Sequence, residues 1–304
     1  MRSGRLWGTA PGMIAVDWGT SSARAYRLAP DGAILARREG AGGILRVPEG
    51  GFPAALAEMV GHWLAEGEAR VLLSGMVGSR QGWQEAPYLA CPAGLDDLAR
   101  SVVPVAFAEA AVRLVPGLSA EDAACIPEVM RGEEVQVFGA LAEGHEDALI
   151  CLPGSHAKWV RVVGGRIAGF TTSMTGEAFA ALSGHTILGR MMTGTAEPGP
   201  AFEAGVARAA EDGGLLHHLF GTRTLGLFGR LAPEDAASYL SGLLIGHDVA
   251  SAMAEPARVR LVGSGPLMAL YGRAIALKGG EAVAGDPDSA ARGLALIGER
   301  TAWT

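Results

Sequence analysis

The sequence predicts an α/β protein built from two duplicated domains that face each other across a cleft. The chain has 304 residues, which exceeds the usual size of one domain and suits two domains of roughly 150 residues each. A pattern of strand, small-residue turn, strand, glycine hairpin and strand begins at MIAVDWG and returns at ALICLPG, about 135 residues later. Short apolar strands alternate with helical segments in both halves, which favours layered α/β domains.

The first half contains the elements of one domain in order. Strands are expected in MIAVDWG, ARAYRL and AILA, with a hairpin at Asp31 and Gly32. An amphipathic helix ending at Gly67 and a strand in VLLSGMVGS are expected next. The segment RQGWQEAPYLACPAG shows neither helical nor strand periodicity and is interpreted as a binding loop. A helix over 94–101, a strand in VVPVAF and a helix from about Gly132 are expected after it. The apolar face of the first helix comprises Phe52, Leu56, Met59, Val60, Trp63 and Leu64.

The second half repeats the opening strands and is then expected to be rich in helices over 176–252. The strand RVRLVGSG, a helix from Pro266, the strand EAVAG and a final helix over 288–299 follow. We place the boundary at 143–147, which gives domains of 13–145 and 146–304. Residues 1–12 are expected to form a poorly ordered extension.

Composition argues against several classes of partner. The formal charge of −7 comes with no basic stretch, which argues against nucleic acid. Cys91, Cys125 and Cys151 are widely spaced and lack metal-ligand spacing, so reduced thiols are expected. No apolar run approaches the ~20 residues that span a bilayer. We therefore expect a cytoplasmic protein whose partners are small molecules.

The two hairpin tips suit phosphate binding, because glycine and serine let backbone N–H groups approach oxygen closely. Asp17 precedes the first tip, and a carboxylate at a strand end suits Mg²⁺ held mainly through water and phosphates. The alternative is that Asp17 only caps a turn. The second tip has no matching acid, so contacts from Ser155, His156 and Lys158 are expected there, although His156 could only stabilise the turn and Lys158 could be a solvated strand residue.

Six segments in order carry a resemblance to a known family: DWGTSSARAYRL, SGMVGSRQGWQEAPYLACPAG, MRGEEVQVFGAL, LPGSHAKWVRV, MTGEAFAALSGHTILGR and LVGSGPLMALYGRAI. Together, from residue 13 to about 297, they resemble the 2-dehydro-3-deoxygalactonokinase family of the acetate and sugar kinase, Hsc70 and actin superfamily. The resemblance implies two actin-like (ribonuclease H-like) domains with a nucleotide cleft between them. It also implies ATP, Mg²⁺ and phosphoryl transfer to the 6-hydroxyl of 2-dehydro-3-deoxy-D-galactonate in galactonate breakdown.

The resemblance assigns three nucleotide-binding motifs. Phosphate-1 falls on 17–22, phosphate-2 on 153–158 and the adenosine motif on 263–267, where an apolar strand runs into Gly-Ser-Gly before a helix. Phosphate-2 usually presents an aspartate, but this chain has Leu152 and Pro153, so a metal ligand from the second domain stays open. The predicted nucleotide-binding residues are Gly19, Thr20, Ser21, Ser22, Gly154, Ser155, His156, Lys158, Gly263, Ser264 and Gly265.

The segment SRQGWQEAPYLACP contains most of the expected acceptor contacts. Arg80 suits a carboxylate, and Trp83 and Tyr88 suit the face of a sugar. Both aromatic residues could instead be core, because aromatic side chains pack readily. The predicted acceptor-binding residues are Arg24, Ser79, Arg80, Gln81, Trp83, Tyr88 and Arg131.

Glu133 and Glu134 are candidates for the base that accepts the hydroxyl proton. Adjacent helix positions differ by about 100°. Glu134 shares the face of Phe138 and Leu141, so it is expected to point towards the core and the cleft, and Glu133 more to the side. Acids in a first turn are also favoured by the helix dipole without any catalytic role. We hypothesise Glu134 as the base, with Glu133 and Asp17 as the other catalytic candidates.

Other functions stay open on the sequence alone. Galactonate-derived and gluconate-derived acids differ at one hydroxyl, so a kinase of a related 2-keto-3-deoxy acid is an alternative. A GEE segment before the second hairpin is also similar to that of exopolyphosphatase-like phosphohydrolases. A non-enzymatic actin-like structural or regulatory protein is the third alternative. The sequence does not fix whether the chain forms a homo-oligomer.

Overall fold

The computed structural model describes residues 12–40, 42–141 and 147–303, and it divides into two compact units. Unit 1 comprises 1–145, 165–167 and 288–304, and unit 2 comprises 146–164 and 168–287. Most of the predicted N-terminal extension and of the predicted boundary segment lie outside the described residues.

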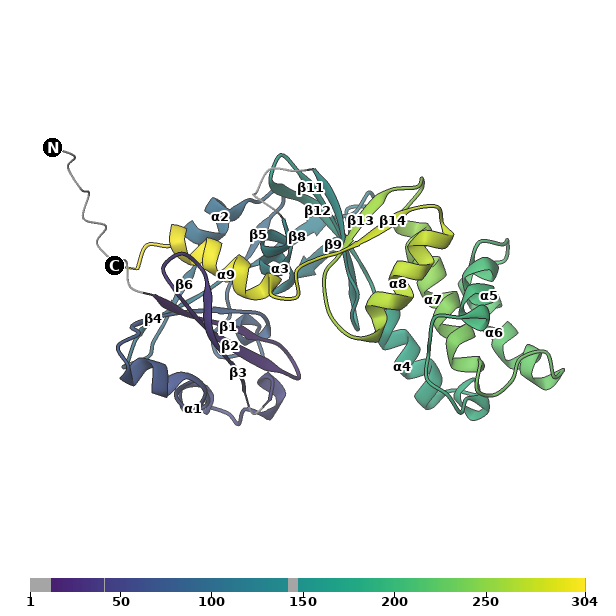
Figure 1. The fold of residues 1–304 in the computed structure, drawn as a ribbon, viewed down its shortest axis with the longest axis horizontal. Coiled ribbons are helices and arrows are strands. Elements are labelled where there is room, and N and C mark those ends of the chain that lie inside the picture. The colour runs from purple at the N-terminus through teal and green to yellow at the C-terminus, as the bar shows by residue number, and fades with distance from the viewer. Residues whose placement is uncertain (1–11, 41, 142–146, 304) are drawn as a thin grey trace. The chain divides into compact units, whose positions relative to one another are not determined.

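Unit 1 contains a six-stranded sheet in the order β3-β2-β1-β4-β7-β6 (Figure 1). Its strands are β1 (Met13–Trp18), β2 (Ala23–Leu28), β3 (Ile34–Glu39), β4 (Arg70–Ser74), β6 (Val103–Val105) and β7 (Ala111–Leu114). A second sheet contains β5 (Tyr88–Ala90), β8 (Gly117–Glu121) and β9 (Pro127–Met130). The helices are α1 (Phe52–Ala65), α2 (Leu95–Arg100), α3 (Glu133–Ala140) and α9 (Ser289–Arg300). The sequence did not predict β7 or the small sheet, because these strands are short and only partly apolar.

Helix α1 forms where its apolar spacing predicts. Five of the six expected face residues are buried in the core of unit 1, and Leu64 packs against it partly buried. The helix ends before Gly67, whose φ of 104° belongs to the left-handed region that glycine adopts without strain. The Gly67 N–H donates to the Leu64 carbonyl, so the predicted glycine cap is confirmed.

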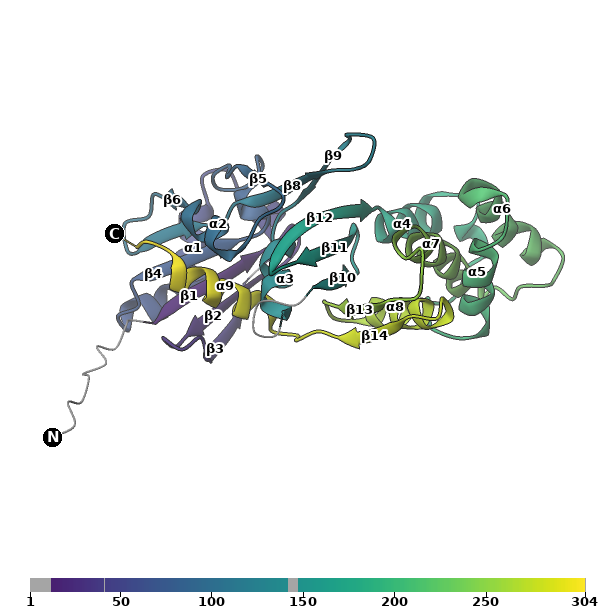
Figure 2. The ribbon, with the colours of Figure 1, turned by 90° about the horizontal axis from the view of Figure 1, so that it is seen from above.

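Unit 2 repeats the core topology of unit 1, with a five-stranded sheet in the order β12-β11-β10-β13-β14 (Figure 2). The strands are β10 (Ala148–Leu152), β11 (Ala157–Val163), β12 (Arg166–Ser173), β13 (Arg258–Leu261) and β14 (Glu281–Ala284). As in unit 1, the first strand pairs antiparallel with the second and parallel with a later strand. The predicted duplication of an α/β domain is therefore confirmed.

The strand register corrects one detail of the repeat. The sequence repeat aligns Gly19 and Thr20 with Gly154 and Ser155 and predicts the same offset through the whole turn of each copy. Asp17 lies opposite Arg24, however, whereas Leu152 lies opposite Lys158. The second turn is therefore one residue shorter, which makes Arg24 and Lys158 equivalent positions.

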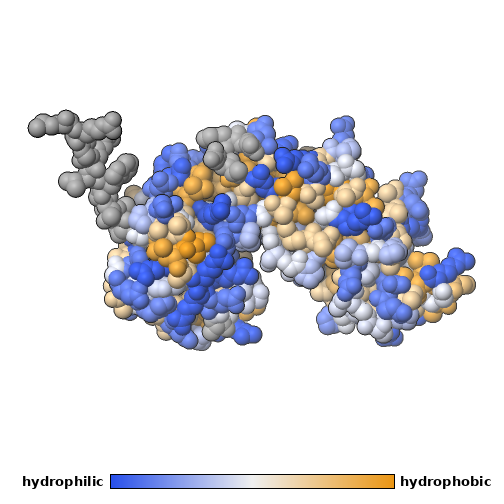
Figure 3. Space-filling view, viewed as in Figure 1, coloured by the Kyte–Doolittle hydropathy of each residue, from blue (hydrophilic) through white to orange (hydrophobic). Residues whose placement is uncertain are grey.

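The helices of unit 2 are α4 (Thr175–His185), α5 (Pro200–Ala209), α6 (Gly214–Leu227), α7 (Ala236–Ala252) and α8 (Pro266–Leu277). They confirm the predicted helix-rich segment. Helix α6 exposes 86% of Leu216, 57% of Phe220 and 60% of Leu227, and Figure 3 shows hydrophobic surface at this end of the unit. In the described part of the chain, no helix is long and apolar enough to cross a membrane.

The final helix differs from the predicted domain division. The sequence places residues 288–304 in the second domain, but α9 packs against α3 and the sheet of unit 1. Glycines make this contact close: a Cβ on Gly139 of α3 would lie 1.8 Å from the Ser289 carbonyl oxygen, and one on Gly293 of α9 would lie 1.9 Å from that of Val135. Helices α5 and α7 of unit 2 cross in the same way at Gly205 and Gly242.

We predict that Gly139→Ala destabilises the protein, because its methyl group forces α3 and α9 apart. Overpacking of this kind costs about 1–3 kcal/mol of unfolding free energy. The matched control is Gly61→Ala in α1, where a Cβ meets no atom within 4 Å. That change should stabilise the protein by roughly 0.5–1 kcal/mol through helix propensity. Urea unfolding of both variants measures this difference, and equal midpoints would contradict the tight α3–α9 contact.

Candidate active site

The carboxylate of Asp17 lies at the end of β1 against two glycine backbones of unit 1. A Cβ on Gly75, the residue after β4, would lie 3.4 Å from Asp17 Oδ1 and 2.8 Å from the Trp18 carbonyl oxygen. A Cβ on Gly132, which precedes α3, would lie 3.1 Å from the Gly75 Cα. Gly75 and Gly132 have φ of 92° and 105°, which other residues rarely adopt. Three segments far apart in sequence therefore meet at Asp17.

Burial raises the pKa of Asp17 to about 6; the nearby Arg24 opposes this shift, and the nearby Glu133 adds to it. Within the described residues, no hydrogen bond or ion pair ends on the Asp17 carboxylate. The group is thus half-buried, repelled by one neighbouring acid and available to a ligand. A carboxylate in this state is stabilised when a cation binds beside it.

Glu134 is fully buried, as its helix position predicts, but its carboxylate folds back towards the backbone at the start of α3. Its two carboxylate oxygens accept the Gly132 N–H at 2.9 and 2.7 Å. Burial, assisted by repulsion from Glu133, raises the pKa of Glu134 to about 8. Glu133 is only half-buried, and one of its oxygens accepts the Arg131 N–H at 2.9 Å. Glu134 therefore fixes the turn. The other Glu133 oxygen accepts no hydrogen bond from the described residues, and Glu133 lies close to Asp17.

The predicted phosphate-1 turn is held by a hydrogen bond within it and by the backbone of residues 43 and 44. The Gly19 N–H donates to the Ser22 carbonyl at 2.9 Å, and the Ile44 N–H donates to the Gly19 carbonyl at 3.0 Å. A Cβ on Gly43 would lie 2.3 Å from the Thr20 carbonyl carbon. The exposed residues at this turn are Thr20, Ser21 and Ser22.

The predicted acceptor residues do not share one environment. Arg80 is 87% exposed and pairs with Glu85 at 3.3 Å. Trp83 stacks on Phe52 with ring centroids 6.2 Å apart and packs against the core of unit 1, which agrees with the core alternative. Arg24 and Gln81 are exposed, Ser79 is half-buried, Tyr88 is 42% exposed and Arg131 is buried.

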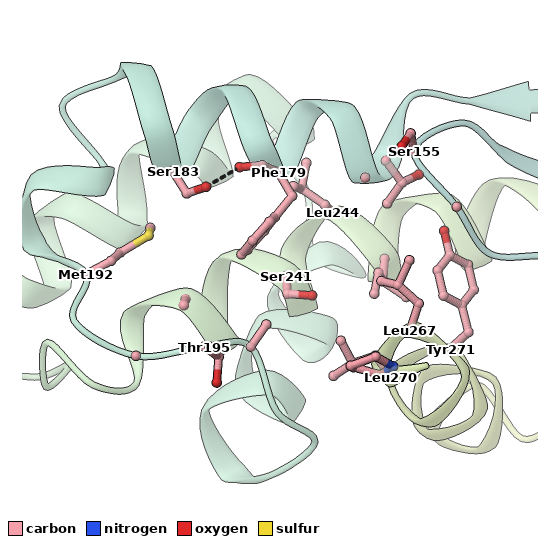
Figure 4. A pocket seen from close by; sticks show the side chains of 18 residues that line it. Ser155, Phe179, Ser183, Met192, Thr195, Ser241, Leu244, Leu267, Leu270 and Tyr271 are labelled. Carbon is pink, nitrogen blue, oxygen red and sulfur yellow. Dashed lines mark hydrogen bonds between the residues drawn. The ribbon is translucent and has the colours of Figure 1, made fainter. Parts of the chain in front are cut away.

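Unit 2 contains a cavity of about 470 Å³ that joins two of the predicted motifs (Figure 4). Gly154 and Ser155 of the second hairpin and Pro266 and Leu267 at the start of α8 all line it. Figure 4 shows Phe179 of α4 projecting towards this space, with residues of α7 and α8 below it. Sequence reasoning did not find most of the lining, because it comes from α4 and α7 as apolar or small side chains: Thr175, Gly176, Phe179, Ser241, Leu244 and Ile245.

The remaining motif residues of unit 2 are not among those that line this cavity. His156 pairs with Glu177 of α4, and the buried Lys158 donates to Thr172 Oγ1 at 2.8 Å. Gly263 and Gly265 have φ of 150° and 81°, so the turn that holds Ser264 requires glycine on both sides. The turn leads directly into the helix that carries Leu267.

Asp248 of α7 connects three elements beneath the cavity. Its buried carboxylate accepts Trp159 Nε1–H from β11 at 3.1 Å, Thr175 Oγ1–H from α4 at 3.0 Å and the Tyr271 hydroxyl of α8. Thr175 and Tyr271 both line the cavity. Since both Asp248 oxygens are engaged by these donors, this residue positions the pocket wall. The signal in the sequence was a single acid within the apolar helix LLIGHDVAS.

The two repeated sheets, each with its hairpin at the start, define a protein of the two-domain actin-like fold. The activator of 2-hydroxyisocaproyl-CoA dehydratase from Clostridium difficile, solved with bound ADPNP, shares this fold with a TM-score of 0.52 at 14% identity, covering 95% of each chain.

The family follows from three findings. The family model for 2-keto-3-deoxy-galactonokinase matches residues 17–297. The chain is 39% identical to a protein assigned as a 2-dehydro-3-deoxygalactonokinase in Rhizobium meliloti (strain 1021), covering 97% of this chain and 99% of that protein. It is 37% identical to the 2-dehydro-3-deoxygalactonokinase of Escherichia coli (strain K12), covering 90% and 93%. The chain belongs to the 2-keto-3-deoxy-galactonokinase family, as the sequence motifs predicted, and this membership supports use of ATP.

A crystal structure agrees with this assignment. A protein from Sinorhizobium meliloti, also assigned as a 2-dehydro-3-deoxygalactonokinase, has a TM-score of 0.84 at 39% identity. The alignment covers 94% of this chain and 95% of that one.

We predict that Gly176→Ala weakens binding of adenine nucleotides. Its Cβ would lie 2.5 Å from the Gly154 carbonyl oxygen and 2.9 Å from the Ser155 Cα, so α4 must move away from the second hairpin. A loss of about 1.4 kcal/mol corresponds to a tenfold higher Kd, which calorimetric titration with ATP measures. The matched control is Gly184→Ala on the same helix, where a Cβ meets no atom within 4 Å. Equal affinities in the two variants would contradict this role of the α4 start.

Proposed function

We propose that this chain is an ATP-dependent kinase that phosphorylates the 6-hydroxyl of 2-dehydro-3-deoxy-D-galactonate to give 2-dehydro-3-deoxy-6-phosphogalactonate. The observation that carries the proposal is the near full-length relationship to two proteins of that name at 39% and 37% identity. A kinase that draws on ATP and has unpaired thiols fits the cytoplasm, which is where we place the reaction.

The two units offer different chemistry for this reaction. The cavity of unit 2 is lined mainly by apolar side chains with a few hydroxyl groups, which suits a nucleoside base and sugar. The Gly154 and Ser155 turn at its edge offers small residues to phosphate oxygens. Unit 1 supplies the acids at Asp17 and Glu133, which suit a reacting hydroxyl and its proton.

The residues present fit Mg²⁺ that accompanies the nucleotide. Among the described residues, no three His, Cys, Asp or Glu side chains converge on a metal site. Mg²⁺ commonly binds through one or two carboxylates together with water and substrate phosphates, so the half-buried Asp17 is sufficient as its protein contact. When bound, the ion neutralises charge on the transferring phosphoryl group. Asp17 would hold it, with the glycine backbones of residues 75 and 132 leaving the necessary space.

The geometry favours Glu133 over Glu134 as the base. A base must be ionised and must reach the proton that it accepts. Glu134 is buried, its pKa is raised to about 8 and its oxygens are turned to the Gly132 N–H, so near neutral pH it is mostly protonated. Glu133 is half-exposed and close to Asp17. We therefore assign proton acceptance to Glu133, metal contact to Asp17 and support of the turn to Glu134.

We predict ATP consumption only with the acceptor acid present. A coupled ADP assay against galactonate-derived and gluconate-derived 2-keto-3-deoxy acids should give turnover of about 1–100 s⁻¹ on the preferred acid. Mass spectrometry of the product should place the phosphate on the 6-hydroxyl. Stronger activity on the gluconate-derived acid would change the substrate. Phosphate release from polyphosphate, or nucleotide binding without transfer to any acid, would overturn the proposed kinase.

We predict that Glu133→Gln lowers kcat by about 10²–10⁴, the usual contribution of a general base. Asp17→Asn should also lower turnover by orders of magnitude, because phosphoryl transfer depends on a correctly placed metal. Glu134→Gln should retain most of the turnover, since the amide oxygen can still accept the Gly132 N–H. A collapse of kcat in Glu134→Gln with normal Glu133→Gln would reverse the assignment.

Stability against pH gives an independent control for Glu134. Its folded pKa of about 8 exceeds the ordinary value of 4.5, so between these values the folded protein keeps a proton that the unfolded chain has released. Stability is therefore lost as pH rises through this window. Glu134→Gln removes this loss, so its stability relative to the wild type should rise from pH 5 to pH 8, by on the order of a kcal/mol or more. A constant difference would show that Glu134 is ionised when folded.

A further inference from the structure

Arg131 carries a buried positive charge that is only partly satisfied by the protein. Its side chain is 7% exposed, and Nη2 donates to the Ala86 carbonyl at 2.7 Å. Among the described residues, Nε and Nη1 have no hydrogen-bond partner. A buried charged donor without a partner is costly, by about 1–3 kcal/mol or more, so such groups usually serve a ligand or an ordered water.

The surrounding segments hold this guanidinium in a fixed position. It lies over the Tyr88 ring at 4.3 Å from the centroid, a favourable cation–π distance. The ring has room because residue 117 is glycine, where a Cβ would lie 2.7 Å from Tyr88 Cδ1. A Cβ on Gly78 would lie 3.1 Å from Arg131 Nη1. The backbone of the 78–88 loop and the Tyr88 ring thus form a rigid cradle around one cation.

A second unpaired polar group lies in the same loop. Ser79 directly follows Gly78, and its buried Oγ has no partner among the described residues. The loop is closed by the Ala86 N–H, which donates to the Gly78 carbonyl at 2.9 Å. A guanidinium and a hydroxyl group are both donors, and together they match a ligand that carries only acceptors at one end.

Two short backbone segments connect the donors of Arg131 and Ser79 to the acids of unit 1, Asp17 and Glu133. Gly75 lies three residues before Gly78, and Gly132 directly follows Arg131; these two glycines are the ones packed against Asp17. Arg80, in contrast, is 87% exposed and already pairs with Glu85. An exposed, paired arginine gives a carboxylate little binding energy, whereas a desolvated, pre-oriented one gives more.

We propose that Arg131, assisted by Ser79, binds the carboxylate end of the acceptor and selects 2-keto acids over uncharged sugars. The inference rests on the proposed kinase function and deepens it. A 2-keto carboxylate presents only oxygen acceptors, which match the unpaired donors of Arg131 and Ser79. The distal hydroxyl at the other end of the acceptor is then left for the acids of unit 1.

The test compares the sugar acid with its methyl ester in Arg131→Ala and in the control Arg80→Ala. In Arg131→Ala we expect the acid KM to rise about 100-fold while the ester KM and the ATP KM stay within twofold of the wild type. Added guanidinium chloride should restore part of the acid turnover. Arg80→Ala should change the acid KM by less than twofold.

Two results would overturn the inference. One is a folded Arg131→Ala variant with an unchanged acid KM, and the other is an equal loss on acid and ester, which is the mark of a structural role. If Arg131→Ala does not fold, Arg131→Lys keeps the charge, loses the planar fork and must show the same selective loss. Calorimetric titration of the wild type and Arg131→Lys with acid and ester, without ATP, separates this question from turnover. Failure of the wild type to phosphorylate any acid would affect the proposed function alone.

Discussion

The packing of Gly75 against Gly132 is the contact on which the chemistry of unit 1 depends. Each glycine has a positive φ; a Cβ on Gly75 would collide with the Trp18 carbonyl oxygen, and one on Gly132 would press on the Gly75 Cα at 3.1 Å. Their contact joins the end of β4 to the start of α3 and leaves Asp17 half-buried between them. The same contact fixes Arg131 and Glu133 on either side of Gly132. A single methyl group at this point would therefore disturb the metal contact, the base and the acceptor site that we propose, all together.

Duplication gave the chain two similar sheets, but their equivalent positions have different chemistry. The first copy has Asp17 opposite Arg24, and the second has Leu152 opposite Lys158. Loss of the acid in the second copy is accompanied by an apolar pocket between the hairpin turn and α8. Asp248, the buried acid beneath that pocket, is saturated by three donors and serves packing. The acid chemistry that we propose thus lies in unit 1, and the apolar pocket that we propose for the nucleoside lies in unit 2.

The sequence predicted those features that depend on local pattern. The repeated hairpins, the α1 face and the glycine turns follow from periodicity and from residues that tolerate few conformations. It assigned the carboxylate to Arg80 and not to Arg131, because burial of a charge depends on contacts among segments 45 residues apart, as the Arg131 bond to Ala86 shows. Trp83 was assigned to a sugar face with the core as the alternative, and its contact with Phe52 favours the core. Helix α9 was placed in the wrong unit because its glycine contact with α3 leaves no local signal.

The two adjacent glutamates show how one helix start can produce two different acids. Both lie in the first turn of α3, where the helix dipole favours a negative charge. Glu134 faces the core, and desolvation outweighs the dipole and the Gly132 N–H, so the pKa rises to about 8. Glu133 faces outward and contributes to the raised pKa of both Glu134 and Asp17. Repulsion of this kind is relieved when a cation or a proton arrives, which fits the metal contact at Asp17 and the proton acceptance at Glu133 that we propose.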